Sequence, residues 1–358
     1  MPFYPGLKRL PFTSDERIRA ADRLLGLRKQ IRDTVPPKTV TDTLLLATWN
    51  IRDFDSNKFG HGPRLPESFY YIAEIIASFD LVAVQEVNDL DALEKIVRIL
   101  GPSWDYIVTD VTAGRSGNNE RMAFIFDRGK ILFQKVVGEI VLPDNQLVGG
   151  KRQFARTPFF VSFQAGWFKF SLCTVHIYYG SDSGAELERR IEEIDSLAEF
   201  LAARAKDEVG NFILLGDFNI VSPQHRTMEA LTRHGFVIPE ALQGSPSNMF
   251  RTKHYDQIAF NVQEGQLQIA DHDKAAGVLN YYETLYTDRD FEAYDKLLEG
   301  ERRQPWDTDE KGKARSEAAK RTYYEREWRT WQMSDHLPMW VELKIDFSDG
   351  YLSRLTRT

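Results

Sequence analysis

The chain has 358 residues, of which 42% are hydrophobic and 28% are charged, and its formal net charge at pH 7 is -7. This composition is typical of a soluble globular protein and excludes a disordered or fibrous one. The negative charge disfavours binding of nucleic acid by bulk positive charge, but it is compatible with an enzyme that has a few well-placed cations.

The cysteine content and the apolar runs bear on cellular location. Cys173 is the only cysteine, so no intrachain disulfide can form and a cytoplasmic location is favoured. The first residues contain no apolar segment of signal-peptide length, and no run approaches the roughly 20 apolar residues of a membrane helix. We therefore expect neither a targeting peptide nor a membrane anchor. None of these features indicates an oligomeric state.

The N-terminal region is predicted to be a helical appendage. Apolar residues recur at helical spacing over residues 14–33, and Pro36 and Pro37 end that pattern. We predict an N-terminal extension and linker over residues 1–43, followed by one main domain over residues 44–358.

Four short apolar runs after the linker each end in polar residues. Continuous apolar runs are typical of strands that are buried on both faces. Helix candidates between the runs predict a layered α/β fold. If these strands end at one edge of the sheets, their terminal polar residues share a cleft. Those residues are Asn50, Glu86, His176, Asp217 and Asn219.

The middle and the end of the chain contain further strand patterns. Four closely spaced strands are predicted to form an antiparallel meander, over residues 122–126, 130–137, 159–163 and 167–172. Strands are also predicted at residues 257–262 and 339–345, and a largely helical, charged insertion lies between them at about residues 271–333.

The end of that insertion mixes basic and aromatic side chains, which allows two interpretations. One is a nucleic-acid clamp with stacking aromatic rings. The other is a buried helix face, because Tyr324, Trp328 and Trp331 recur at helical spacing. The spacing favours the buried face.

The polar residues that follow the strands suit cation chemistry. Glu86, Asp335, Asp217, Asn50 and Asn219 all offer hard oxygen ligands, with no cysteine among them. Such a set favours Mg²⁺, Mn²⁺ or Ca²⁺ over a thiolate zinc site.

Two histidines accompany these oxygen donors, and each has a candidate carboxylate to orient it. The histidines are His176 and His336, and the candidate carboxylates are Asp256 and Glu120. A carboxylate bonded to one ring nitrogen fixes the tautomer and increases the basicity of the other nitrogen. A cation with two oriented histidines suits attack of water on a phosphodiester.

Eight short motifs occur in the order found in the DNase I-like endonuclease/exonuclease/phosphatase superfamily. The chain resembles this superfamily over about residues 44–345. The motifs are Thr48-Trp49-Asn50, Gln85-Glu86-Val87, Asn119-Glu120-Arg121 followed by Phe124-Ile125-Phe126, Arg156-Thr157-Pro158, Val175-His176, Leu215-Gly216-Asp217-Phe218-Asn219, Tyr255-Asp256-Gln257-Ile258 and Ser334-Asp335-His336-Leu337-Pro338.

The resemblance implies a four-layer α/β/β/α sandwich with the site at one edge of the sheets. It also implies a metal site. Glu86 would be the principal ligand, helped by Asn50 and Asp335, with Mg²⁺ or Mn²⁺ as the cofactor and Ca²⁺ as a third candidate.

The resemblance assigns the two histidines different tasks. His336, oriented by Asp256, would be the general base that acts on water. His176, oriented by Glu120, would bind the phosphate and act as a general acid or as a stabilising donor.

Three further residues complete the site that the resemblance implies. Asp217 and Asn219 would contact a phosphate oxygen, the leaving group or a second metal. Arg156 would hold a phosphate near the scissile bond, as guanidinium geometry suits.

The chain departs from DNase I at two positions that contact DNA there. DNase I has an arginine where this chain has Asn88, and a tyrosine where it has Asn118. We therefore do not expect DNase I-like reading of the minor groove. The leading hypothesis is a metal-dependent nuclease that takes DNA or RNA. The alternatives are a phosphatase or phosphodiesterase acting on phosphoinositide, sphingomyelin or another small phosphoester, and an inactive binding module.

Overall fold

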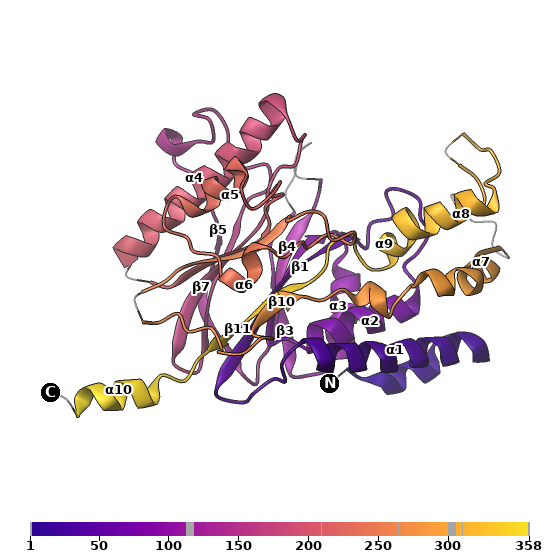
Figure 1. Cartoon of the computed structure of the whole chain (residues 1–358), viewed down its shortest axis with the longest axis horizontal. Helices are drawn as coiled ribbons and strands as arrows, with labels where there is room; N and C mark the ends of the chain where they lie inside the picture. The colour runs from indigo at the N-terminus through magenta and orange to yellow at the C-terminus, as the bar shows by residue number, and fades with distance from the viewer. Residues whose placement is uncertain are drawn as a thin grey trace.

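The computed structural model describes residues 2–111, 118–208, 210–263, 265–299, 306–309 and 311–356. Two β-sheets lie at the centre of the molecule, and Figure 1 shows helices α1, α2 and α3 on one side of the strands and α4 and α5 on the other. Two sheets flanked by helices form the α/β/β/α sandwich that the sequence predicts.

The first sheet has six strands within the described residues. Strands β1 and β2 are parallel and central, and β11 pairs with β1 in the antiparallel sense. The order across the sheet is β10 (Ala276–Val278), β11 (Met339–Lys344), β1 (Thr43–Phe54), β2 (Leu81–Val87), β4 (Arg121–Asp127) and β3 (Trp104–Val108).

The second sheet has five strands in the described part of the chain. Strands β7 and β8 are parallel, and the other neighbours are antiparallel. The order is β5 (Ile131–Glu139), β6 (Phe159–Ala165), β7 (Phe168–His176), β8 (Phe212–Asp217) and β9 (Asp256–Asn261).

The predicted four-strand meander is wrong in one respect. Strands β5, β6 and β7 do form an antiparallel meander, but β4 pairs with β2 and β3 in the first sheet. The turn after β4 therefore crosses from one sheet to the other. Strand spacing along the chain could not reveal this crossing, because a short turn joins strands of either sheet equally well.

The helices cover the outer faces and the edge that carries the insertion. The α-helices are α1 (Ser14–Thr34), α2 (Pro66–Ala77), α3 (Leu90–Leu100), α4 (Gly184–Glu208), α5 (Arg226–Thr232), α6 (Glu240–Gln243), α7 (Phe291–Glu299), α8 (Glu317–Tyr323), α9 (Arg329–Gln332) and α10 (Ser348–Leu355). The other helical turns are η1 (Tyr4–Arg9), η2 (Asp144–Gln146), η3 (Tyr281–Glu283), η4 (Asp288–Asp290) and the π-helical turn η5 (Tyr324–Trp328). Within the described residues, no helix combines the length and apolarity needed to cross a bilayer.

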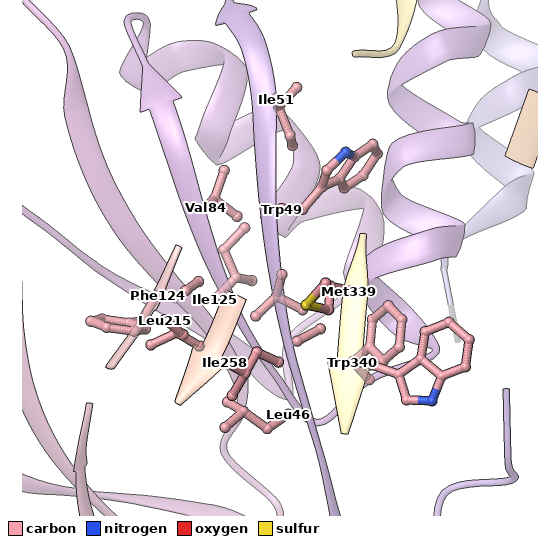
Figure 2. Close-up of a cluster of buried hydrophobic side chains, with 14 of the residues drawn as sticks. Leu46, Trp49, Ile51, Val84, Phe124, Ile125, Leu215, Ile258, Met339 and Trp340 are labelled. Atoms are coloured by element: carbon pink, nitrogen blue, oxygen red, sulfur yellow. The ribbon is translucent and has the colours of Figure 1, made fainter. Parts of the chain in front are cut away.

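A continuous apolar core joins the two sheets. Leu46 of the first sheet and Leu215 and Ile258 of the second are fully buried, and Figure 2 shows them in one cluster with Phe124. Burying one such side chain stabilises the fold by roughly 1.5–3 kcal/mol. The sheets therefore provide a rigid frame for the loops at their edge.

Helix α1 is joined to both the main domain and the insertion. Its Arg19 pairs with Glu67 of α2 at 3.2 Å, and Arg23 pairs with Asp290 of the insertion. These contacts hold the insertion beside the first sheet. The division of the chain at residue 43 stays a prediction.

The aromatic residues at the end of the insertion are buried. Tyr324, Trp328 and Trp331 are each 2% exposed or less. The interpretation as a buried helix face is therefore confirmed, and these rings do not form an exposed clamp.

Candidate active site

An irregularity in β2 presents Glu86 to the edge of the sheets. The pairing of β2 with β4 shifts register between Val84 and Val87, and Glu86 has a positive φ of 62°. Such a bulge re-aims a side chain next to a site. Glu86 accepts hydrogen bonds from the Asn50 amide at 2.9 Å and from the backbone N–H of Asp53 at 2.6 Å.

The environment of Glu86 is rich in negative charge. Burial raises the pKa of its carboxyl, and the carboxylates of Glu120, Asp53 and Asp335 raise it further, against the opposing effect of His176. A cation at this position would relieve that repulsion.

His336 is held by Asp256, which lies at the start of β9. The Nδ1–H of His336 donates to the Asp256 carboxylate at 2.8 Å, and Asp256 is fully buried. Burial alone lowers the pKa of His336, but the charges of Asp256 and Asp217 raise it well above the ordinary value. This orientation leaves Nε2 of the ring facing Asp217.

His176, the last residue of β7, is held by Glu120, which directly precedes β4. Its Nδ1 lies 2.9 Å from the Glu120 carboxylate, which also accepts from Nε of Arg156 at 2.7 Å. Although burial raises the pKa of Glu120, His176 and Arg156 hold it well below its usual range. Burial and Arg156 lower the pKa of His176, whereas Glu120 and Asp217 raise it, and the net direction is upward.

The two imidazoles converge on one oxygen atom of Asp217. The Nε2 atoms of His176 and His336 lie 3.6 Å and 3.7 Å from Asp217 Oδ2, which is too far for direct hydrogen bonds. The Asn50 amide donates to the same oxygen at 3.1 Å. Two ring nitrogens with fixed orientation therefore face one point at the junction of both sheets.

The position of Asp217 depends on a glycine. Gly216 has a φ of 132°, and a Cβ atom built there would lie 2.3 Å from the carbonyl oxygen of Val175. Only glycine allows β8 to approach β7 so closely. The register then places Asp217 directly opposite His176.

A cavity of about 500 Å³ opens over this group. It reaches Glu86, Glu120, Arg156, His176 and Asp335 among the predicted site residues. Its rim also carries Arg52 and Lys58, which the sequence analysis did not single out, and Arg326 from the basic and aromatic stretch at the end of the insertion. The mixture of carboxylates and cations suits a phosphate group together with a metal ion.

The residues present fit a hard divalent cation. The Oδ1 atom of Asn50 is buried and accepts no hydrogen bond from the described residues. The Asp335 side chain is exposed to the cavity, and we find no hydrogen bond or ion pair from its carboxylate to any described residue. Glu86, Asn50 and Asp335 therefore offer oxygen ligands alone, as Mg²⁺, Mn²⁺ and Ca²⁺ prefer.

A second group of potential ligand atoms belongs to Asp217, Asp256 and His336, which lie within 4.8 Å of one another and are buried. One Asp256 oxygen already accepts the His336 Nδ1–H. We interpret this cluster as an oriented histidine with its carboxylates, because a cation there would compete with that proton.

Asn219, which was predicted to contact substrate or metal, and the two asparagines at which the chain departs from DNase I each have a distinct place. The Asn219 amide donates to the Ile177 carbonyl at 2.9 Å, so it ties the loop after β8 to the end of β7. The Asn88 amide folds back onto the Glu86 carbonyl at 2.9 Å, whereas Asn118 lines the cavity.

Two residues that position the site were given no role by the sequence analysis, namely Ser334, which was noted only as part of a motif, and Arg190. Ser334 donates from its hydroxyl to the Asn50 carbonyl at 2.7 Å and accepts from the His336 N–H at 3.0 Å, which links β1 to the Asp335-His336 pair. Arg190 of α4 is fully buried and donates to the Asn219 carbonyl at 3.0 Å. In sequence Arg190 looks like a surface charge, because only the tertiary fold brings the loop to it.

The model of the endonuclease/exonuclease/phosphatase family matches residues 47–296, which is more than half of the chain. The chain belongs to this family. The predicted membership is confirmed.

Curated relatives and solved structures agree with this membership. The chain is 29% identical over 198 residues to a deoxyribonuclease of Thioalkalivibrio sp. (strain K90mix), covering 53% of this chain and 49% of that protein. It is 28% identical over 183 residues to deoxyribonuclease-1 of Bos taurus, covering 49% of this chain and 61% of that protein. The chain thus spans about half the length of the first relative and less than two thirds of the second.

Two solved structures show the same fold at low identity. A mannosyl-6-phosphatase from Bacteroides thetaiotaomicron VPI-5482 is similar with a TM-score of 0.52 and 16% identity, over 84% of this chain and 99% of that one. The human Nocturnin catalytic domain has a TM-score of 0.51 and 13% identity, over 84% of this chain and 94% of that one. These likenesses concern the fold alone.

Proposed function

We propose that this protein is a phosphoester hydrolase that uses a divalent cation, and that its substrate is a nucleic acid. The observation that carries the proposal is the convergence of His176 and His336 on Asp217, beside the carboxylate oxygens of Glu86 that could bind a cation. Proteins of the same family named deoxyribonuclease are among its relatives, which supports a nucleic-acid substrate.

The chain's own residues supply proton transfer and orientation. In its neutral form, His336 would take a proton from the attacking water at Nε2, while Asp256 fixes its Nδ1–H. The carboxylates around His336 raise its pKa, and the charge of a bound cation beside them would oppose that effect. His176 would donate from Nε2 to a phosphoryl oxygen or the leaving oxygen, held by Glu120. A cation bound by Glu86, Asn50 and Asp335 would offset the negative charge that builds on the phosphoryl oxygens.

Arg156 would position the substrate rather than transfer protons. Its guanidinium is fixed by Glu120 and lines the cavity beside His176. A fixed guanidinium matches phosphate geometry and loses little conformational freedom when it binds.

A substrate panel tests the proposal. The protein is incubated with single-stranded DNA, duplex DNA, RNA, phosphoinositide vesicles, sphingomyelin vesicles and mannose 6-phosphate, each with Mg²⁺, Mn²⁺ or EDTA. His336→Gln is compared with His234→Gln, because His234 also pairs with an aspartate, Asp195, at 2.7 Å but outside the cavity.

We expect cation-dependent cleavage of at least one nucleic acid, which His336→Gln abolishes and His234→Gln leaves intact. Release of phosphate from a lipid or sugar substrate, with no cleavage of any nucleic acid, would replace the proposed substrate class. Activity that survives His336→Gln in a folded protein would overturn the site itself.

A further inference from the structure

Phe250 is an exposed aromatic residue held rigidly beside the active site. Its side chain is 55% exposed, in the loop between α6 and β9. The Asn248 side-chain carbonyl accepts from the N–H groups of Thr252 and Lys253, both at 2.7 Å. The N–H of Met249 donates to the Asp335 carbonyl at 2.7 Å. The loop is therefore fixed to the Asp335-His336 segment, although Phe250 contributes little to the core.

Phe250 stands between two cavities. One is the catalytic cavity of about 500 Å³, and the other is a neighbouring cavity of about 600 Å³. Met249 and Phe250 line both of them. The remaining walls of the second cavity come from α1, through Arg23, and from the insertion, where they include Asp288, Arg289 and Arg329.

Each of the two cavities that Phe250 lines also has an arginine of the insertion in its wall. The Arg326 guanidinium is 5.9 Å from the ring centroid, on the side of the catalytic cavity. Arg289 is exposed in the second cavity. In the part of the chain that the structure describes, neither guanidinium forms an ion pair, whereas Arg329 is paired with Asp288 at 2.9 Å. Arg289 and Arg326 are thus available to an anionic ligand.

We propose that Phe250 is a stacking platform for a base of single-stranded nucleic acid whose scissile phosphate lies in the catalytic cavity, and that the second cavity receives the next stretch of the strand. This inference rests on the proposed nuclease function and adds its substrate form. An exposed aromatic ring in a groove that contains cations binds unpaired bases of any sequence, because every base has a π-face. In a duplex those faces are already stacked, so a single strand is the better ligand.

The test compares kcat/KM on a single-stranded oligonucleotide, on its duplex and on bis(p-nitrophenyl) phosphate, which has no base. Phe250→Ala removes the ring, and Phe250→Trp keeps an aromatic face. Phe3→Ala is the matched control, because Phe3 is also 55% exposed and lines neither cavity.

On the single strand we expect Phe250→Ala to lose at least about fivefold in kcat/KM, mainly through KM, which corresponds to about 1 kcal/mol of stacking. The loss on the small diester is smaller, Phe250→Trp restores activity on the strand, and Phe3→Ala matches the wild type. Arg289→Ala should reduce the slope of log KM against log salt by about 0.7 on the strand, as expected for loss of one phosphate contact.

Two failures can be told apart. If the wild type cleaves nucleic acid but Phe250→Ala loses as much kcat/KM on the small diester as on the single strand, the stacking inference is wrong and the nuclease function stands. The same conclusion follows if the wild type and Phe250→Ala both prefer the duplex to the single strand. If the wild type cleaves the small diester and no nucleic acid, the proposed function itself fails.

Discussion

Replacement of Asp256 by asparagine should slow turnover without unfolding the protein. The carboxylate accepts the His336 Nδ1–H at 2.8 Å in a fully buried position. Asp256→Asn keeps the shape and an acceptor oxygen but removes the charge. A hydrogen bond to a charged group contributes about 1.5–3 kcal/mol and a neutral one about 0.5–1.5 kcal/mol. The midpoints of these ranges differ by about 1.25 kcal/mol, which corresponds to about an eightfold fall in kcat.

The assay is steady-state hydrolysis of bis(p-nitrophenyl) phosphate, with urea unfolding to measure stability. Burial raises the pKa of Asp256, so its ionised form is costly and we expect little loss of unfolding free energy. Asp195→Asn is the matched control, because Asp195 pairs with His234 at 2.7 Å away from the cavity. An unchanged kcat in Asp256→Asn, or an equal fall in Asp195→Asn, would refute the orienting role of Asp256.

Three further predictions concern stability. Gly216→Ala should lower the unfolding free energy by about 2–4 kcal/mol, measured by urea unfolding, because its Cβ would lie 2.3 Å from the Val175 carbonyl oxygen at a strained φ. Arg64→Met should lower the unfolding free energy by about 3 kcal/mol in the same assay and also reduce kcat. The reason is that the Arg64 guanidinium donates at 3.0 Å to each of three backbone carbonyls near the site. A loss of unfolding free energy below about 1 kcal/mol would contradict this prediction. Burial lowers the pKa of His61 to about 4, so the unfolded chain takes up its proton first as pH falls. The contribution of neutral His61 to the unfolding free energy is fully present above about pH 6.5 and is lost as pH falls towards 4. His61→Gln should therefore reduce the fall in unfolding free energy between these two pH values by on the order of 1–2 kcal/mol, after allowance for solvent screening.

The sequence contains the polar ends of the strands but not the contacts that bring them together. Asn50, His176 and Asp217 could be identified because each follows an apolar run, and this pattern depends only on local sequence. The family resemblance paired His336 with Asp256, and the structure places them in contact. Both kinds of inference concern residues whose possible role follows from their side-chain type and their position in a local motif.

Other features depend on contacts between distant segments. The bulge that turns Glu86 outward arises from pairing with two different strands, and β4 belongs to a sheet that its spacing did not indicate. Arg190 is fully buried because loops from β7 and β8 fold over it. Phe250 becomes notable only when its exposure and the two adjoining cavities are known. Local pattern carries no information on such packing.

The most direct test of the central claim is cleavage of a labelled single-stranded DNA over a Mg²⁺ titration, with wild-type protein and Glu86→Gln. Glu192→Gln serves as the control, because Glu192 is exposed on α4 and lies outside the cavity. We predict no cleavage in EDTA, cleavage that Mg²⁺ restores, and a requirement for at least about tenfold more Mg²⁺ in Glu86→Gln, as expected when a metal ligand is weakened. Cleavage that persists in EDTA, or a Glu86→Gln protein with the Mg²⁺ requirement of the wild type, would contradict the account.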